Sequence, residues 1–319
     1  APVLMRDSGR VSVVVVNFQG AELLEDCLGS LGMQSYPPFE LVVVDNGSSD
    51  GSEAVARTHG ARWIGLGCNV GLAPAMNVGA QSAQGEYILF VNNDMRFAKT
   101  FLEHLITPLV QANTVFCTDA TQIDWEGTTG IHARTALSRN WSLRGIWPGW
   151  EMRQEVTEKP VHAVMVSGAN VLVRRWMFEQ LGGWDPCYPA GWEDVDLCWR
   201  ARLHGWRTVF VPQAVCWHKV GVASHKAGGE WVRYRGSLGG RLYFAAKLLP
   251  FELATATWGL ALGALVRDTA ARQWSDARRR AALLREVLGL LPTALAERRR
   301  LYAQARRTPR QHLRALAAI

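Results

Sequence analysis

The chain has 319 residues, of which 48% are hydrophobic and 20% are charged, and these proportions exclude a disordered or fibrous protein. Its six scattered cysteines form no CxxC pair, which excludes a zinc ribbon and a dithiol redox motif and favours a reducing compartment. The net charge is +7, but residues 266–319 hold 13 arginines against four acidic residues, so the whole excess lies in that segment.

Buried-type strands alternate with helices in the first half of the chain. The β-branched run 11–17 is too apolar for a strand with one wet face, so it predicts a central strand, and residues 41–45 repeat the pattern. Apolar residues at helical spacing within 22–31 predict a helix between these two strands, so the three elements form a βαβ unit. Residues 87–92 are predicted to form a further buried strand. The pattern predicts an α/β fold.

Polar residues follow three of these predicted strands, at Asn17, at Asp45 and at 92–94. The carboxyl ends of parallel strands share the edge where open α/β sheets bind ligands. Asp45 is placed to accept hydrogen bonds from a base or ribose, although forming a turn and capping the next helix is the alternative. The carboxylate of Asp94 is suited to hold a hard divalent cation against a diphosphate.

The periodicity fades from about residue 119 to 160, so we expect a loop-rich region there. Three carboxylates then crowd into four residues, at Glu193, Asp194 and Asp196, where a helix over 193–204 is predicted to begin. Acidic residues are favoured at helix N-termini by the macrodipole, which is the structural alternative. Because all three cannot be caps, a general base among them is the functional interpretation. His218 is a candidate metal ligand or a structural histidine.

Beyond Glu230 the chain is predicted to be helical to its end. Residues 248–266 are borderline for a membrane-spanning helix, and a core helix is the alternative. The arginine-rich helices that follow have the composition of helices that lie on an anionic membrane surface. We expect membrane contact there rather than nucleic-acid binding, with a solvated face as the alternative. The first ten residues show no apolar run typical of a signal peptide, which favours the cytoplasm.

Seven segments in register resemble the family 2 inverting glycosyltransferases, and within them the bacterial rhamnosyltransferase-like branch. The segments are 13–18, 43–52, 69–79, 89–94, 182–185, 193–197 with Arg200 and Gly205, and His218. The resemblance implies a GT-A fold with a mixed, mainly parallel central sheet and a helical C-terminal extension. It divides the chain into a GT-A domain over 1–247 (nucleotide-sugar half 1–118, acceptor half 119–247) and a membrane-associating extension over 248–319.

The resemblance also implies roles for individual residues. Asp194 corresponds to the catalytic base, and Glu193 is expected to contact donor or acceptor hydroxyl groups. Asp94, helped by His218, corresponds to the ligand of Mg²⁺ or Mn²⁺, although the family usually has an aspartate where this chain has Asn92. The expected nucleotide-sugar contacts are Asn17, Asp45, Asn69, Gly71, Asn77, Asn92 and Asn93. The expected acceptor contacts are Trp184, Asp185 and Trp192, with packing as the alternative for both tryptophans.

The implied activity is transfer of a sugar from a nucleotide-diphosphate donor to a hydroxyl of a lipid-linked or cell-envelope glycan, at the inner face of the cell membrane. The expected donor is dTDP-rhamnose, followed by UDP-hexoses and GDP-mannose. Two alternatives remain open, an inactive GT-A adaptor at the membrane and a sugar nucleotidyltransferase. No glycine-rich phosphate loop follows the first strand, which argues against the nucleotidyltransferase and against a dehydrogenase. The helical extension is also suited to forming a homodimer.

Overall fold

The computed structural model of the protein describes residues 9–36, 40–140, 145–188, 191–222, 229–305 and 307–319. The first half contains β1 (Val11–Asn17), α1 (Ala21–Gly32), β2 (Glu40–Asp45), α2 (Ser52–Thr58), β3 (Arg62–Gly65), α3 (Leu72–Ser82), β4 (Tyr87–Asn92), β5 (Met95–Phe97) and α4 (Phe101–Gln111). The second half contains β6 (Val115–Asp124), β7 (Gly130–His132), β8 (Arg134–Arg139), β9 (Trp150–Glu155), β10 (Val161–His162), β11 (Asn170–Arg174), α5 (Arg175–Gln180), α6 (Glu193–Leu203) and β12 (Arg207–His218). The C-terminal part contains α8 (Glu230–Tyr234), a π-helix η1 (Arg235–Gly240), α9 (Arg241–Leu248), α10 (Phe251–Ala270), α11 (Trp274–Ala303) and α12 (Pro309–Leu316).

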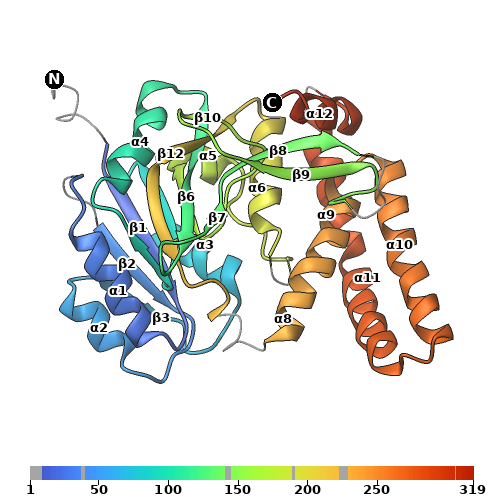
Figure 1. Ribbon diagram of the computed structural model, residues 1–319, viewed down its shortest axis with the longest axis horizontal. Helices are drawn as coiled ribbons and strands as arrows, with labels where there is room; N and C mark the ends of the chain where they lie inside the picture. The colour runs from blue at the N-terminus through green and yellow to red at the C-terminus, as the bar shows by residue number, and fades with distance from the viewer. Residues whose placement is uncertain (1–8, 37–39, 141–144, 189–190, 223–228, 306) are drawn as a thin grey trace.

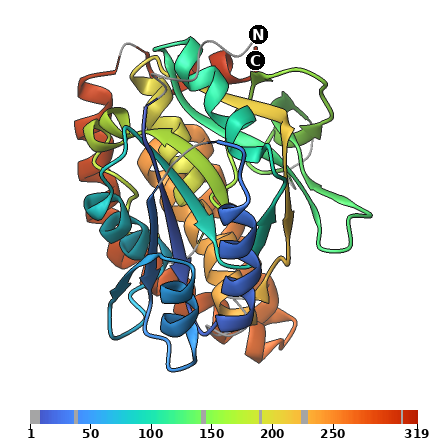
Figure 2. The same ribbon diagram turned by 90° about the vertical axis from the view of Figure 1, so that its left-hand side faces the viewer.

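A mixed sheet forms the centre of the molecule, with helices on both faces (Figures 1 and 2). Its strands run in the order β10-β12-β6-β11-β4-β1-β2-β3, with β5 added beside β12 and β7 beside β6. β1 is parallel to β2 and β4, whereas β11 is antiparallel to β4 and β6. The predicted α/β fold with a mixed central sheet is confirmed.

The alternation of β1 explains how both faces of the sheet are covered. Val13 and Val15 share a buried cluster with residues of α1 and α4, whereas Val14 and Val16 share one with residues of α3. Successive side chains of a strand point to opposite faces, so an unbroken apolar run is what a strand covered on both faces requires. β1 and β4 have the bounds predicted from the sequence.

The region from 119 to 160 is not loop-rich, which corrects the expectation from the fading periodicity. It holds the end of β6, the short strand β7, and an antiparallel hairpin of β8 and β9. The outer parts of β8 and β9 are charged and partly exposed, and such strands lack the long apolar runs that mark buried ones. β8 and β9 are therefore stabilised mainly by pairing with one another, and their sequences lack the apolar pattern that would have predicted them.

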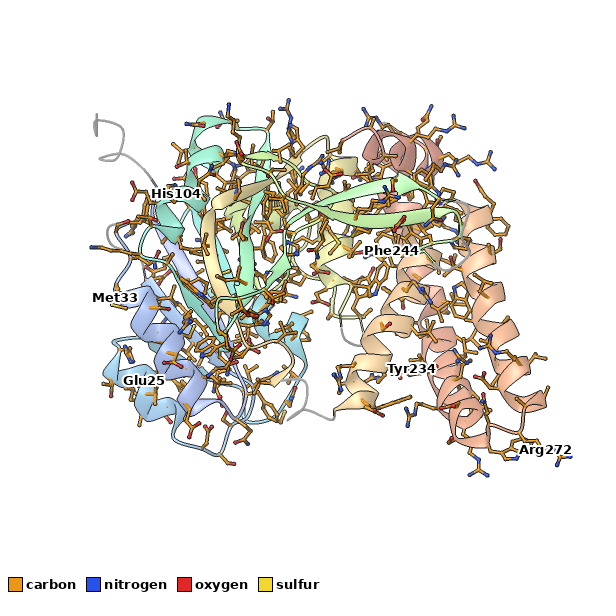
Figure 3. All side chains as sticks on the ribbon, in the orientation of Figure 1. Glu25, Met33, His104, Tyr234, Phe244 and Arg272 are labelled. Carbon is orange, nitrogen blue, oxygen red and sulfur yellow. The ribbon has the colours of Figure 1, made fainter. Side chains whose placement is uncertain are left out.

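One apolar core joins the second half of the chain to the C-terminal helices. Its buried members run from Leu137 through Trp199 and Phe244 to Leu283 and Leu316. The ring of Phe244 lies between the sheet and the outer helices (Figure 3) and stacks on Trp147, with ring centroids 5.5 Å apart. The division into units at residue 247 stays a prediction, and this core crosses it.

No helix in the described ranges is long and apolar enough to cross a bilayer. The borderline segment at 248–266 instead contributes most of α10, which packs against α9 and α11. The tip of the α10–α11 hairpin, near Arg272, is the point farthest from the sheet in this arm (Figure 3).

Acid is expected to weaken the docking of α12 through His312. This histidine is 1% exposed, neither of its ring nitrogens has a hydrogen-bond partner among the described residues, and its ring contacts that of Trp199. Burial, followed by the charges of Arg202 and Arg307, lowers the pKa of His312 to about 3. Below about pH 6.5 the imidazole is therefore protonated in the unfolded chain but stays neutral in the folded chain. The free energy of unfolding falls with pH by about 1.4 kcal/mol per pH unit between the unfolded-state pKa and the folded-state pKa.

The measurement is urea unfolding of the wild type and His312→Leu at pH 7 and pH 5. We expect the wild type to lose about 2 kcal/mol more than the variant over that interval. His104→Leu, a change on the partly exposed side of α4, is the matched control and should follow the wild type. An equal loss in the wild type and His312→Leu would contradict the assignment.

Candidate active site

Three polar residues from three strand ends join directly at one edge of the sheet. Asn17 donates from Nδ2 to Oδ1 of Asp45 at 2.9 Å, and its Oδ1 accepts from Nδ2 of Asn93 at 2.6 Å. All three are buried, so the bonds satisfy polar groups that water does not reach. The sequence prediction that these residues meet at the carboxyl edge of the sheet is confirmed.

Asp45 orders the turn that follows β2. Its Oδ2 accepts from the backbone N–H groups of Gly47 and Ser48 at 3.2 and 2.8 Å, and its Oδ1 accepts from the Ser48 hydroxyl at 2.5 Å. This is the turn-forming role that the sequence offered as an alternative. Contact with a nucleotide base stays a prediction.

Asn46, which sequence reasoning passed over, holds the loop before α3. Its Nδ2 donates to Oδ1 of Asn69 at 3.0 Å and to the carbonyl of Gly71 at 3.2 Å. Gly71 has φ of +94°, a conformation that favours glycine. Asn69 is exposed and Gly71 is half-buried beside the strand-end cluster, which leaves both accessible to a ligand at this edge.

Asp94 and His218 face one another across the β5–β12 pairing. His218 pairs with Met95 in the sheet register, and its Nε2 lies 3.2 Å from Oδ1 of Asp94. That oxygen is buried and accepts no hydrogen bond from any described group. A buried carboxylate oxygen without a donor is costly, and here it stands beside an imidazole nitrogen.

The donor set at this point fits a divalent cation. A carboxylate oxygen is the ligand that Mg²⁺ and Mn²⁺ prefer, and imidazole accompanies it in many transition-metal sites. Within the described ranges no group of three or more His, Cys, Asp or Glu side chains is placed to hold a metal ion. A cation held by Asp94 and His218 would therefore keep positions open for the oxygens of a diphosphate.

Glu193 and Asp194 begin α6 as a pair of carboxylates in a largely buried position. Burial, and then the neighbouring Asp194, raise the pKa of Glu193. Burial also raises the pKa of Asp194, against the opposing effect of the backbone N–H groups of Gly168 and Val195, which donate at 3.1 and 2.8 Å. A buried carboxylate with a raised pKa is suited to proton transfer near neutral pH.

Trp192, the residue before this pair, has a strained backbone conformation, and the π-helix η1 packs closely against it. Trp192 has φ of +74°, a left-handed conformation that is unfavourable for a bulky residue. A Cβ on Gly240, the last residue of η1, would lie 2.8 Å from both the Gly191 carbonyl and Cδ1 of Trp192. Only glycine lets η1 approach the loop this closely, and π-helical turns are frequent at functional sites.

Three consecutive residues link the parts of the site. The Gly168 N–H donates to Oδ2 of Asp194, the Ala169 carbonyl accepts from the Asn92 N–H at 3.0 Å, and Oδ1 of Asn170 accepts from Gln122 at 2.8 Å. Gln122 in turn contacts His218. The segment 168–170 thus connects the carboxylate pair, the strand-end cluster and the Asp94–His218 pair.

The remaining predicted contacts lie in packed surroundings. Trp184 is fully buried against Phe90 and Phe178, so the structure favours packing over sugar stacking for this ring. Both amide atoms of Asn77 pair with the Trp184 backbone, at 2.8 and 2.9 Å. Trp192 is only partly buried, and a role in acceptor binding stays a prediction for it.

Asp185 belongs to a buried ion cluster rather than to an open surface. Its Oδ2 accepts from Nζ of Lys247 at 2.7 Å, and the same ammonium donates to Oδ1 of Asp196 at 2.6 Å. Asp196 also accepts from Nε of Arg200 at 2.5 Å. Burial alone would raise the pKa of Asp196, but Arg200 and Lys247 hold it below its usual range. The cluster ties α9 to α6.

Sequence reasoning missed His132. Its Nε2 lies 2.5 Å from Oδ2 of the fully buried Asp119. Burial alone would lower the pKa of His132, but the Asp119 carboxylate, with a smaller contribution from Asp194, raises it overall. A charged His132 also lowers the pKa of Asp194. The available signal was the carboxylate of Asp119 within the buried part of β6, because a buried polar residue requires a partner.

Two family models match the chain. The one described as Glycosyl transferase family 2 matches residues 12–182, and the one described as Glycosyl transferase family group 2 matches residues 148–291. An N-acetylglucosaminyl-diphospho-decaprenol L-rhamnosyltransferase of Mycobacterium tuberculosis (strain ATCC 25618 / H37Rv) is 29% identical over 231 residues, which cover 65% of this chain and 75% of that protein.

Two solved structures share the fold. The mannosyltransferase PcManGT from Pyrobaculum calidifontis, in complex with GDP-Man and Mn²⁺, gives a TM-score of 0.57 at 21% identity, covering 93% of this chain and 86% of its own. Residues 1–349 of S. aureus TarS give 0.55 at 16% identity, covering 97% and 90%. These likenesses, together with the mixed sheet, confirm the GT-A fold.

Proposed function

Because the chain belongs to glycosyl transferase family 2, we propose that it is an inverting, metal-dependent glycosyltransferase of the rhamnosyltransferase-like type, with Asp194 as its general base. The observation that carries this proposal is the linkage of the Glu193–Asp194 pair to the Asp94–His218 pair through residues 168–170. The proposed base for the incoming hydroxyl and the proposed site for the departing diphosphate are then connected through this segment and Gln122.

The proposed reaction assigns a task to each carboxylate. Asp194 removes the proton from an acceptor hydroxyl, whose oxygen attacks the anomeric carbon on the side opposite the nucleoside diphosphate. The bond from that carbon to the diphosphate oxygen breaks, the configuration inverts, and the diphosphate leaves with the bonding electron pair. Glu193, whose pKa is raised, is suited to donate a hydrogen bond to a sugar hydroxyl.

The proposed cation site consists of Asp94 and His218. A divalent cation bound there would neutralise charge on the diphosphate as a Lewis acid. The buried, unpartnered Oδ1 of Asp94 supports this assignment, and the presence of Mn²⁺ in the PcManGT complex agrees with it. Asn17, Asp45, Asn69, Gly71, Asn77, Asn92 and Asn93 stay the proposed contacts of the nucleotide sugar.

For the substrates, we propose dTDP-rhamnose as the donor, ahead of UDP-hexoses and GDP-mannose, and a lipid-linked glycan as the acceptor. The name of the mycobacterial relative, which joins rhamnosyl transfer to a diphospho-decaprenol acceptor, supports both choices. The family match is to glycosyl transferases and gives no support to a nucleotidyltransferase.

A thermal-shift screen with dTDP-, UDP- and GDP-sugars tests the donor and cation sites. One nucleotide class should raise the melting temperature only when Mn²⁺ is present, because a ligand that binds the folded state alone stabilises it, by about 2.7 kcal/mol at a hundredfold excess over Kd. Asp94→Asn should lose the part of the shift that depends on Mn²⁺. No shift with any nucleotide would favour the inactive adaptor.

We also propose that α10 and α11 contact the cytoplasmic membrane surface. Phe251, Leu262 and Val266 are 75%, 49% and 68% exposed, and their positions i, i+11 and i+15 place them on one face of α10. Exposed arginines, Arg272 among them, surround the tip of the hairpin. An exposed apolar stripe flanked by arginine is typical of helices that lie on anionic lipid.

Vesicle sedimentation tests this contact without shortening the chain. Replacing Phe251, Leu262 and Val266 together by serine should lower binding to anionic vesicles at least about tenfold, since each buried CH₂ contributes about 0.8 kcal/mol. The matched control replaces three exposed apolar residues elsewhere, Met33 and Val110 and Val156, by serine and should bind as the wild type does. Equal binding by both triple variants would contradict the proposal.

A further inference from the structure

A row of buried polar side chains stands behind His218, on the side away from Asp94. Nδ1 of His218 lies 3.0 Å from Oε1 of Gln122, and Nε2 of Gln122 donates to Oδ1 of Asn170 at 2.8 Å. Nδ2 of Asn170 then donates to Sγ of Cys216 at 3.1 Å. Gln122, Asn170 and Cys216 are 3%, 0% and 0% exposed, so water does not substitute for any of these bonds.

A backbone carbonyl fixes the direction of this row. The carbonyl oxygen of Thr121 accepts only, so the single proton of the Cys216 thiol, 3.4 Å away, points to it. The sulfur is then the acceptor for Nδ2 of Asn170, and Oδ1 of Asn170 faces Gln122 and accepts a hydrogen bond from its Nε2. Oε1 of Gln122 is left as an acceptor, and Nδ1 of His218 must carry the proton that meets it.

The other ring nitrogen follows from this choice. In the neutral form of His218 the proton therefore sits on Nδ1, and the lone pair of Nε2 points toward Oδ1 of Asp94, 3.2 Å away. That oxygen has no hydrogen-bond donor among the described groups. Two electron-pair donors side by side suit a cation between them. The bond from Nδ1 to Gln122 fits the same role, since ligating histidines usually donate their second N–H to a neighbouring acceptor.

We propose that Gln122 is a positioning residue, which fixes the tautomer and orientation of His218 so that Nε2 is presented as a ligand for a divalent cation. The inference rests on the proposed cation site and adds a residue to it. Gln122 lies on β6, outside every segment that carries the family resemblance, and contacts both His218 and Asn170.

The first measurement reads the tautomer without any metal. Long-range ¹H–¹⁵N correlation spectra of protein labelled at histidine are recorded at a pH where the imidazole is neutral, and His218 is identified by its loss in His218→Gln. They should show protonated Nδ1 and unprotonated Nε2. Gln122→Met keeps the length of the side chain and removes the acceptor, so the Nε2-protonated form should appear. A wild type with its proton on Nε2 would overturn the inference.

The second measurement is Mn²⁺ affinity, from the electron paramagnetic resonance signal of the free ion. Gln122→Met should weaken binding about 10- to 100-fold, whereas Thr121→Val, which removes a side-chain bond from the same strand, should stay within about twofold of the wild type. Asp94→Asn should lose the site. Wild-type affinity in Gln122→Met would overturn the positioning role, whereas a correct tautomer with no Mn²⁺ binding in the wild type would overturn the cation site.

Discussion

Asp194→Asn is expected to slow sugar transfer by about 10²- to 10⁴-fold, the usual contribution of a positioned general base. The amide keeps the shape of the carboxylate, and its oxygen still accepts the backbone N–H of Gly168 or Val195, so the loop stays in place. Nucleotide affinity should therefore remain within about twofold, and the loss should appear in kcat. The measurement is initial transfer rate beside nucleotide Kd.

Asp124→Asn provides the control, because Asp124 is a carboxylate at the end of β6 that bonds to Thr128 in an exposed turn. It should retain the wild-type rate. Turnover at the wild-type rate in Asp194→Asn would exclude this residue as the base and move the role to Glu193.

The pH profile gives the same assignment an independent check. A base must be ionised to accept a proton, and the pKa of Asp194 is raised by burial. Activity should therefore fall with decreasing pH at a higher pH than the value of about 3.9 typical of a free aspartate. In Asp194→Asn, the residual rate should lose this acidic limb.

Lys247→Met is expected to destabilise the protein by about 3–5 kcal/mol, the usual effect of removing one partner from a buried ion pair. Lys247 is 1% exposed and bonds to both Asp185 and Asp196. Without the ammonium, Asp185 keeps the bonds from the Tyr243 hydroxyl and the Cys187 N–H, and neither donor carries a charge. Chemical denaturation of the purified protein measures the loss.

Arg310→Met is the matched control for this substitution. Arg310 forms an ion pair with Glu252 at 2.6 Å, the same length as the Lys247–Asp196 contact, but both of its members lie at the surface. Exposed pairs contribute little because water screens them, so the midpoint should not move measurably. Equal shifts in Lys247→Met and Arg310→Met would show that burial does not decide the strength of the cluster.

The first half of the fold follows from the sequence because its strands are buried on both faces. β1 and β2 each combine two signals that can be read from the sequence, an apolar strand and a polar residue at its carboxyl end. These end residues are Asn17 and Asp45. Local chemistry is enough in that case, since burial and strand ends are properties of short segments.

The residues that sequence reasoning missed acquire their roles from pairing between distant segments. Gln122 and Asn170 are ordinary polar residues until the sheet brings them to 2.8 Å, and Lys247 meets Asp185 across 62 positions of sequence. The role of Trp184 could not be decided from the sequence, because the same tryptophan side chain can pack in a core or stack on a ligand. Neither the spacing of residues along the chain nor the composition predicts which strands will be neighbours in the sheet.

The core that crosses residue 247 also limits how relatives of this enzyme can exchange parts. A chimaera joined at that residue would place the α9 side of the core, including Phe244 and Leu248, against helices with which it never coevolved. Core residues tolerate mismatched volumes poorly, so recombination there would be selected against. The second half of the chain and its C-terminal helices are therefore expected to be inherited together.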